Sequence, residues 1–200
     1  MSRLIMIRHG ESLANLEGRF TWTVDEPLTP MGVEQARATG EHLSIHFTPK
    51  VLYASPFRRA FDTAREIGGI FGLEPQVVEA FREQDFGVFK GQPYANFYGS
   101  HAAGSAERWE LLPEGGERLR EVAERAGAAL DRIAEEHAGD EVLVVSHGGV
   151  MSALRGWVRA DYTRAPTPTR NAWGYVLQWR SGDYRGPIEL DDYPGSEPRE

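Results

Sequence analysis

The chain has 200 residues, of which 40% are hydrophobic and 26% are charged, and its formal net charge at pH 7 is −8. This composition is typical of globular proteins, and an acidic chain lacks the positive face that nucleic acids and anionic membranes attract. With no cysteine in the sequence, disulfides, thiolate catalysis and cysteine-ligated metals are excluded. The apolar run after Met1 is too short for a signal peptide. We therefore expect one cytoplasmic domain over residues 1–200, with neither nucleic acid nor membrane as a partner.

The first predicted element is a strand at residues 4–7, because the apolar run LIMI is typical of a strand buried on both faces. An amphipathic helix follows over residues 29–47, with Thr29 as its N-cap and Pro30 at the first helical position. A short strand is expected at residues 51–55. After each of these two predicted strands, at 4–7 and at 51–55, the pattern indicates a helix further along the chain.

The second helix is expected over residues 55–71, and the segment PQVVEAF at residues 75–81 predicts another strand. Residues 87–116 are rich in glycine, proline and aromatic residues with little periodicity, which is typical of a long excursion over the surface. We expect this excursion to face the substrate. A long helix from about residue 113 to 137 and an aliphatic strand at residues 141–146 follow.

The last third of the sequence predicts a helix at residues 147–158 and a strand near the sheet edge at residues 172–179. A turn at residues 182–183 leads to a weak final strand around residue 188, and residues 191–200 are expected to form a loose tail. Alternating strands and helices indicate an α/β fold with three layers, α/β/α, around a mostly parallel central sheet.

Polar residues follow three of the predicted strands. The three groups are Arg8-His9-Gly10, Ser55 with Arg58 and Arg59, and Ser146-His147-Gly148-Gly149. Ligands of open α/β sheets bind outside the carboxyl ends of the strands, so we expect the three groups to converge. The glycines after both histidines, including Gly148, are expected to let backbone amides approach a bound anion.

Two imidazoles and two guanidiniums in one crevice form a site for a dianion, and a phosphate group is the common one. Positive neighbours would hold the imidazole of His9 neutral, so that its lone pair is free to attack phosphorus. The leaving alkoxide needs a proton, and Glu83 after the third strand is the candidate acid. This chemistry requires neither a metal nor a cofactor.

Five blocks of the sequence, in order, resemble the histidine phosphatase superfamily, also called the phosphoglycerate mutase-like family. They are RHGES followed by Asn15, PLTPMG at 27–32, SPFRRAFDTA at 55–64, REQDFG at 82–87 and SHGG at 146–149. The resemblance covers about residues 3–180 and implies a phosphoglycerate mutase-like fold. It also implies roles for six residues: phosphorylation of His9, phosphate binding by Arg8, Arg59 and His147 with help from Asn15, and proton donation by Glu83.

Within this family, the short segment between Glu83 and His147 and the sequence PEGGERLREV at 113–122 are similar to the phosphatase branch. The family's aromatic after the GES block is replaced by Ala14, and the glycine expected between Thr21 and Trp22 is missing. We therefore expect a phosphatase that hydrolyses a small phosphorylated metabolite through a phosphohistidine. A phosphoglycerate mutase with the same chemistry is the alternative, and a phosphoprotein-binding module without catalysis is a third hypothesis.

The other histidines have simpler interpretations. His42 and His46 have the spacing of a zinc pair but no third ligand in view, so a solvated helix face is expected. His101 belongs to the excursion, and His137 near a helix C-terminus is explained by the helix dipole. The aromatic residues of the strand at 172–179 are compatible with a homodimer that pairs edge to edge, or with packing inside one subunit.

Overall fold

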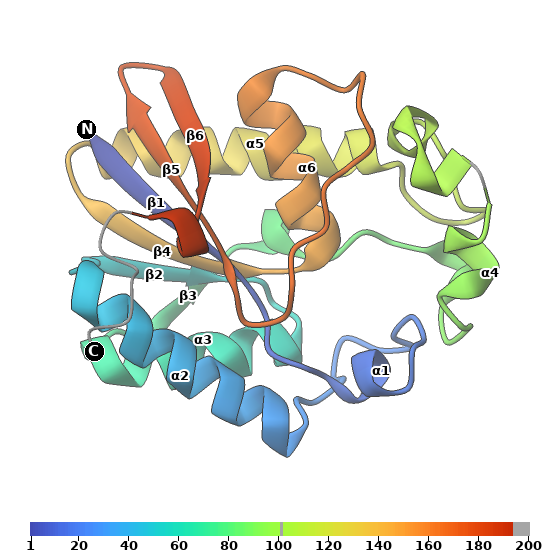
Figure 1. Cartoon of the computed structure of the whole chain (residues 1–200), viewed down its shortest axis with the longest axis horizontal. Helices are drawn as coiled ribbons and strands as arrows, with labels where there is room; N and C mark the ends of the chain where they lie inside the picture. The colour runs from blue at the N-terminus through green and yellow to red at the C-terminus, as the bar shows by residue number, and fades with distance from the viewer. Residues whose placement is uncertain (101, 194–200) are drawn as a thin grey trace.

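The computed structural model describes residues 1–100 and 102–193. Within them, six strands form one sheet in the order β3-β2-β4-β1-β5-β6 (Figure 1). The strands are β1 (Ser2–Arg8), β2 (Val51–Ala54), β3 (Pro75–Val77), β4 (Glu141–Ser146), β5 (Gly174–Arg180) and β6 (Asp183–Glu189). The helices are α1 (Leu13–Leu16), α2 (Pro30–His46), α3 (Arg58–Phe71), α4 (Ala95–Tyr98), α5 (Leu119–Glu136) and α6 (Gly148–Arg159). The predicted α/β class with a mostly parallel sheet is confirmed.

The strand register places three strand ends side by side. β4 lies between β2 and β1 and is parallel to both, while β5 is antiparallel to β1. Arg8 pairs with Ser146, and Ala54 pairs with Val145, so β1, β2 and β4 end at nearly the same level. Residues that follow these strands therefore emerge together at one edge of the sheet.

Helices cover both faces of the sheet, as Figure 1 shows, with α2 and α3 on one face and α5 and α6 on the other. Side chains alternate along β1 in the way that this layering requires. Leu4 and Met6 belong to the core cluster formed with α5 and α6, whereas Ile5 and Ile7 belong to the cluster formed with α2 and α3. The predicted helix start at Thr29 is confirmed, because its side chain accepts a hydrogen bond from Gly32 N at 3.0 Å.

The predicted excursion is built of short helical turns rather than irregular chain. It contains α4 and the single 3₁₀ turns at 87–89, 102–104 and 106–109, at the end of the molecule where Figure 1 labels α4. The aromatic residues pack as a small separate core. Its buried members are Phe20, Phe86, Phe97 and Ala103. This core joins the excursion to the loop after α1.

Three predicted boundaries differ from the structure. The strand predicted at 75–81 ends at Val77, because its partner β2 ends opposite it at Ala54, and residues 79–81 form a 3₁₀ turn instead. The long helix starts at Leu119 rather than near 113, since Gly115 has a φ of 68°, which places a turn there. The weak final strand is the seven-residue β6, which forms one edge of the sheet.

The strand expected near the edge is β5, with β6 outside it. Its aromatic residues Tyr175 and Trp179 are buried in the core cluster with α5 and α6, so packing inside the subunit accounts for them. The outer strand β6 carries Pro187, which cannot donate a backbone hydrogen bond to a further strand. A homodimer therefore stays a prediction without support from these side chains.

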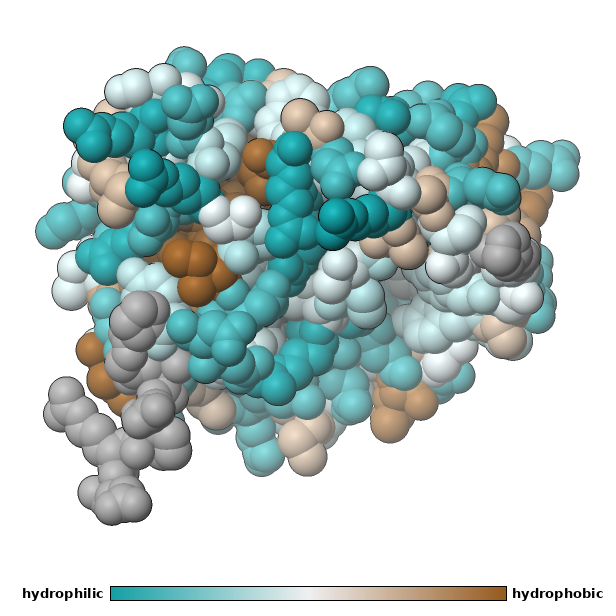
Figure 2. Space-filling view, turned by 45° about the horizontal axis from the view of Figure 1, so that its top comes forward, coloured by the Kyte–Doolittle hydropathy of each residue, from teal (hydrophilic) through white to brown (hydrophobic). Residues whose placement is uncertain are grey.

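The surface is mostly hydrophilic on the face that Figure 2 shows, where hydrophobic residues lie in small separate patches. Scattered apolar residues of this kind are normal on globular proteins. Across residues 1–100 and 102–193, no helix is long and apolar enough to cross a membrane. Of the tail predicted at 191–200, residues 190–192 form a 3₁₀ turn, and residues 194–200 lie outside the described residues.

Candidate active site

The polar residues that follow β1, β2 and β4 converge, as the sequence predicts. The ring of His9 lies edge-on to the ring of His147, with a distance of 5.1 Å between the ring centroids. Ser55 Oγ lies 2.7 Å from His147 Nε2 and so connects the end of β2 to the same cluster. Both histidines are almost fully buried, with exposed fractions of 2% and 0%. The two histidines therefore lie together, as the phosphate chemistry expected from the sequence requires.

Hydrogen bonds fix the tautomer of His9. Its Nδ1 lies 2.7 Å from the carbonyl oxygen of Gly10, which can only accept, so Nδ1 carries the proton. Nε2 consequently carries the lone pair, and it accepts a hydrogen bond from Arg59 Nε at 3.1 Å. Arg59 reaches this position from the first turn of α3, where it is 4% exposed. Arg58 is instead exposed and pairs with Asp62 one turn along α3.

The surroundings keep both imidazoles neutral. Burial lowers the pKa of His9 well below its usual value, and the guanidiniums of Arg59 and Arg8 lower it further. The pKa of His147 is lowered by burial as well, with Arg59 and His9 as its next strongest influences. An uncharged imidazole with a free Nε2 lone pair is the form of histidine that acts as a nucleophile.

Several buried nitrogen atoms of the cluster have no hydrogen-bond partner within the described part of the chain. They are Arg8 Nε, Arg59 Nη1 and His147 Nδ1. Leaving a buried polar group unpaired costs free energy, so such atoms commonly mark a binding site. The other end of the Arg8 guanidinium is fixed, because Nη1 donates to the carbonyl oxygen of Thr169 at 2.6 Å. The arrangement suits an anion that presents several acceptor oxygens.

Glu83 lies across from the cluster and is held by backbone amides. Its Oε1 accepts a hydrogen bond from Gln84 N at 2.9 Å, and its Oε2 accepts one from Gly149 N, in the first turn of α6, at 3.3 Å. A Cβ atom at Gly149 would lie 2.4 Å from Glu83 Oε1. Glycine at this position thus gives the carboxylate its space.

Gly10 has a different role from the one predicted, whereas the prediction for Gly148 stays open. Gly10 N donates to Thr63 Oγ1 at 3.0 Å, and a Cβ atom at Gly10 would lie 2.3 Å from the carbonyl oxygen of Gly32. The expectation that its amide faces an anion is therefore wrong for Gly10, which instead lets the loop after β1 pack against the start of α2. Gly148 lies directly beside the Arg8 guanidinium.

A cavity of about 630 Å³ opens onto this cluster. Six of the seven predicted site residues line it: Arg8, His9, Asn15, Arg59, Glu83 and Gly148. The seventh, His147, is fully buried and lies edge-on against His9, which lines the cavity. No group of three or more potential metal ligands occurs among residues 1–100 and 102–193.

The family-model comparison matches the histidine phosphatase superfamily (branch 1) over residues 4–185. The chain belongs to this superfamily. A metal-independent phosphoserine phosphatase of Arabidopsis thaliana is 32% identical over 77% of this chain and 67% of the relative. A 2,3-bisphosphoglycerate-dependent phosphoglycerate mutase of Gloeobacter violaceus is 36% identical, over 77% of this chain and 74% of the relative.

Solved structures show the same fold. A mycobacterial glucosyl-3-phosphoglycerate phosphatase in complex with VO3 matches with a TM-score of 0.81 and 29% identity, over 92% of this chain and 96% of that one. The family and the fold predicted from the sequence are thus confirmed, and the chain is similar to phosphatases as well as to a mutase.

Asn15 belongs to a polar network at the rim of this histidine phosphatase site. Its Oδ1 accepts hydrogen bonds from Ser12 N at 3.2 Å and Asn171 Nδ2 at 2.9 Å, and its Nδ2 donates to Tyr94 Oη at 2.9 Å. Asn171 also donates to the carbonyl oxygen of His9 at 3.1 Å. No sequence motif pointed to Asn171, which lies in a loop.

Arg108 is the second residue that the sequence analysis missed. It lines the cavity from the 3₁₀ turn at 106–109 and is 3% exposed. Its neighbour Trp109 is anchored in the core, with Nε1 donating to the carbonyl oxygen of Arg164 at 2.7 Å. The only signal for Arg108 in the sequence is an arginine directly before a tryptophan, and its burial follows from packing that the sequence does not show.

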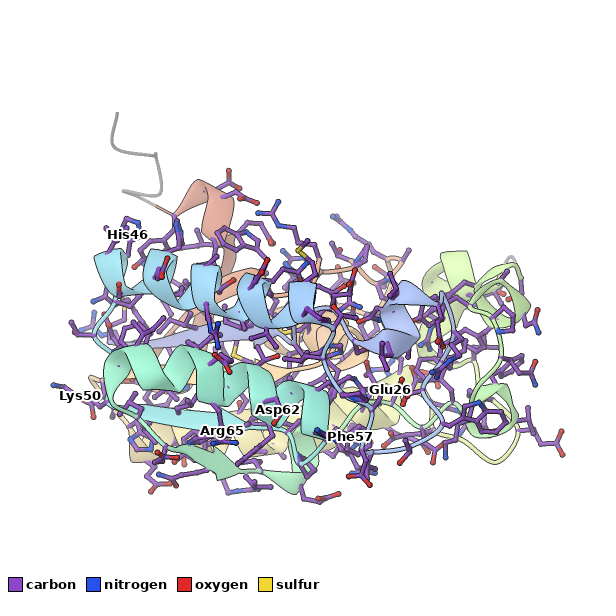
Figure 3. All side chains as sticks on the ribbon, turned by 90° about the horizontal axis from the view of Figure 1, so that it is seen from below. Glu26, His46, Lys50, Phe57, Asp62 and Arg65 are labelled. Carbon is purple, nitrogen blue, oxygen red and sulfur yellow. The ribbon has the colours of Figure 1, made fainter. Side chains whose placement is uncertain are left out.

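The remaining histidines lie outside the site. Figure 3 places His46 at the far end of α2, whereas Phe57 and Glu26 mark the end of the helical layer next to the site. His42 and His46 pack against each other, and His42 also packs against Trp173 with 5.0 Å between ring centroids, so the pair is half-buried rather than fully solvated. His137 ends α5 and pairs with the Tyr53 hydroxyl. His101 lies outside the described residues.

Proposed function

We propose that this histidine phosphatase hydrolyses a small phosphomonoester through a phosphohistidine at His9, without a metal or cofactor. The observation that supports this most directly is the Nε2 atom of His9, which is unprotonated, buried and in contact with a guanidinium. Such an atom can form a bond to phosphorus, while the guanidiniums of Arg8 and Arg59 bind the phosphoryl oxygens.

In the first step, the lone pair of His9 Nε2 attacks phosphorus and the ester bond between phosphorus and oxygen breaks. The departing oxygen takes a proton from the carboxylic acid of Glu83 and leaves as an alcohol. Arg8, Arg59 and the N–H of His147 Nδ1 share the charge of the phosphoryl group. The unpartnered state of these nitrogens and the edge-on contact of His147 with His9 support that assignment.

In the second step, the Glu83 carboxylate takes a proton from water, whose oxygen attacks the phosphorus of phosphohistidine. The bond between phosphorus and Nε2 breaks, inorganic phosphate leaves, and neutral His9 and protonated Glu83 are restored. Asn15 is proposed to assist by holding Tyr94 at the cavity wall, and Gly148 by placing α6 beside Arg8.

The test uses p-nitrophenyl phosphate, phosphoserine and 3-phosphoglycerate with the full chain, with and without a chelator. We expect release of inorganic phosphate that a chelator does not reduce, and a phosphoenzyme that is labile to acid and stable to base. Loss of turnover on chelation, or turnover that survives unchanged in His9→Ala, would contradict the proposal.

A mutase is the second candidate function, because a phosphoglycerate mutase is among the similar proteins. It would interconvert phosphoglycerates and release little phosphate. The same assay separates the two, since only the phosphatase consumes phosphoglycerate with equal release of phosphate. A cytoplasmic location stays a prediction from the sequence.

A further inference from the structure

Five cationic side chains line the cavity, and they differ in whether a carboxylate already neutralises them. They are Arg8, Arg59, Arg82, Lys90 and Arg108. Lys90 pairs with Asp85 at 2.8 Å, and Arg82 pairs with Glu117 at 3.4 Å. Arg8, Arg59 and Arg108 form no ion pair with a carboxylate within residues 1–100 and 102–193. The proposed function uses the first two and leaves Arg108 unexplained.

Arg108 is held in place by uncharged groups. Its Nη2 donates to Gln84 Oε1, its guanidinium lies over the Phe97 ring at 4.9 Å from the ring centre, and the Tyr98 hydroxyl contacts it. Its Nη1 is buried and has no hydrogen-bond partner among the described residues. A buried guanidinium whose direct contacts are all neutral is costly, because these contacts replace only part of the lost hydration of its charge.

The position of Arg108 differs from that of the two phosphate-binding arginines. Arg59 and Arg8 both lower the pKa of His9, and Arg108 is not among the groups that do so. The charge of Glu83 raises the pKa of Arg8, Arg59 and Arg108 alike, against the effect of burial. Glu83 lines the same cavity as these three arginines, and Arg108 reaches it from the 3₁₀ turn at 106–109, beside the Phe97 ring.

Glu83 marks where the ester oxygen of a substrate would lie, since it donates the proton to that oxygen. With the phosphate at His9, the alcohol part of the substrate would occupy the rest of the cavity, whose wall includes Arg108. We propose that Arg108 is a specificity-determining residue that binds a carboxylate on the alcohol part, so that the preferred substrates are phosphate esters of hydroxy acids. This inference rests on the proposed function for the orientation of the substrate.

The charges agree with this assignment. A phosphate dianion and one carboxylate carry three negative charges, which match the three guanidiniums that lack an acidic partner. A second phosphate group in place of the carboxylate would also be a dianion, but it would meet only the guanidinium of Arg108. The first phosphate group, by contrast, meets two guanidiniums and two imidazoles. Trp109 anchors the 3₁₀ turn of Arg108 in the core, so the cation is pre-positioned for its ligand.

The test compares 3-phosphoglycerate with glycerol 3-phosphate, which has a hydroxymethyl group in place of the carboxylate. We expect Arg108→Gln to reduce kcat/KM for 3-phosphoglycerate roughly 10- to 100-fold more than for glycerol 3-phosphate, because a charge-assisted contact with the carboxylate is lost. The difference should appear mainly in KM. Arg108→Lys should restore part of the preference. Equal losses for the two substrates in Arg108→Gln would overturn the proposal, as would an unchanged KM for the acid.

Lys90→Gln is the matched control, because it removes a positive charge from the same cavity wall that Asp85 already neutralises. It should change kcat/KM for both substrates by a similar factor. Calorimetric binding of the two compounds separates this inference from the proposed function. If no phosphomonoester is turned over, the proposed function fails. A binding preference for the acid that Arg108→Gln removes would still support the subsite, and binding without such a preference would refute it.

Discussion

The two sides of the cavity are held by different kinds of structure. On one side, Arg8, His9 and His147 follow strands whose positions are fixed by backbone pairing through the middle of the sheet. On the other side, Tyr98 and Arg108 lie on short turns outside the sheet, which pack around Phe20 and Phe97 and are joined to the loop after α1 by a few backbone hydrogen bonds. The proposed catalytic groups of this histidine phosphatase are thus positioned by the ends of the strands, whereas Arg108, the proposed specificity residue, is positioned by a small aromatic core beside the sheet.

The largest expected effect is on kcat, and it comes from removing His9, which lies on the side of the cavity that the sheet positions. We predict that His9→Ala lowers kcat on the order of 10⁴-fold or more, because no other group can form the phosphoenzyme. Steady-state phosphate release and phosphoenzyme trapping measure it. His46→Ala is the control, since this ring lies at the other end of α2. Retention of a tenth of the activity by His9→Ala would contradict the assignment.

Glu83 lies where the two sides meet, and its removal should have the next largest effect. We predict that Glu83→Gln lowers kcat for an alkyl phosphate roughly 10²- to 10⁴-fold, because the alkoxide then leaves without a proton. The loss should be smaller for p-nitrophenyl phosphate, whose leaving group needs no protonation. Comparing the two substrates under saturating conditions tests this role, and identical losses would exclude Glu83 as the acid. Glu79→Gln, on the same cavity wall, is the control.

A smaller change tests the contact between the start of α6 and Glu83. We predict that Gly149→Ala lowers kcat for alkyl phosphates roughly 10- to 100-fold, since the new methyl group displaces the carboxylate by about 1 Å. The matched control is Gly69→Ala in α3, where a Cβ atom meets nothing within 4 Å. That variant should keep its activity and gain about 0.5–1 kcal/mol in unfolding free energy. Similar kinetics for both variants would mean that Glu83 is not held by Gly149.

The smallest expected effect is on the unfolding free energy, and it comes from burying the two neutral histidines His9 and His147. The pKa values of His9 and His147 are lowered in the folded state, so below about pH 6.5 the unfolded chain binds protons that the folded chain does not. The unfolding free energy should therefore fall with decreasing pH, by up to about 1.4 kcal/mol per pH unit for each histidine. Denaturant unfolding between pH 5 and 7 measures this slope, which His147→Gln should reduce. A slope that is the same in this variant would contradict the prediction.

The sequence was informative where hydrophobic periodicity leads directly into polar residues. The apolar runs at 4–7 and 141–146 are strands, and the histidines that follow them meet because neighbouring parallel strands end together. The position of Arg58 and Arg59 in the first turn of a helix indicated a nearby anion for both, and the resemblance to the family, whose arginine directly precedes an alanine, selected Arg59. These features are local, so one sequence is sufficient to find them.

Other features depended on packing between distant segments. Asn171 and Arg108 reach the site from loops whose course is fixed by the polar network around Asn15 and by the aromatic core, and neither has a periodic signal. The end of β3 at Val77 is fixed by the length of its neighbour β2. Glycine is required at position 10 because the backbone of Gly32 packs directly against it. Such constraints involve pairs of residues that a reading along one chain does not connect.

The hydrogen bond from Arg59 to His9 Nε2 also bears on which reagents the resting enzyme accepts. Under the proposed function, an incoming phosphate has to draw this guanidinium to its own oxygens before the lone pair of His9 Nε2 can attack phosphorus. Attack by His9 Nε2 is thus coupled, in the proposed function, to the binding of an anion by Arg59.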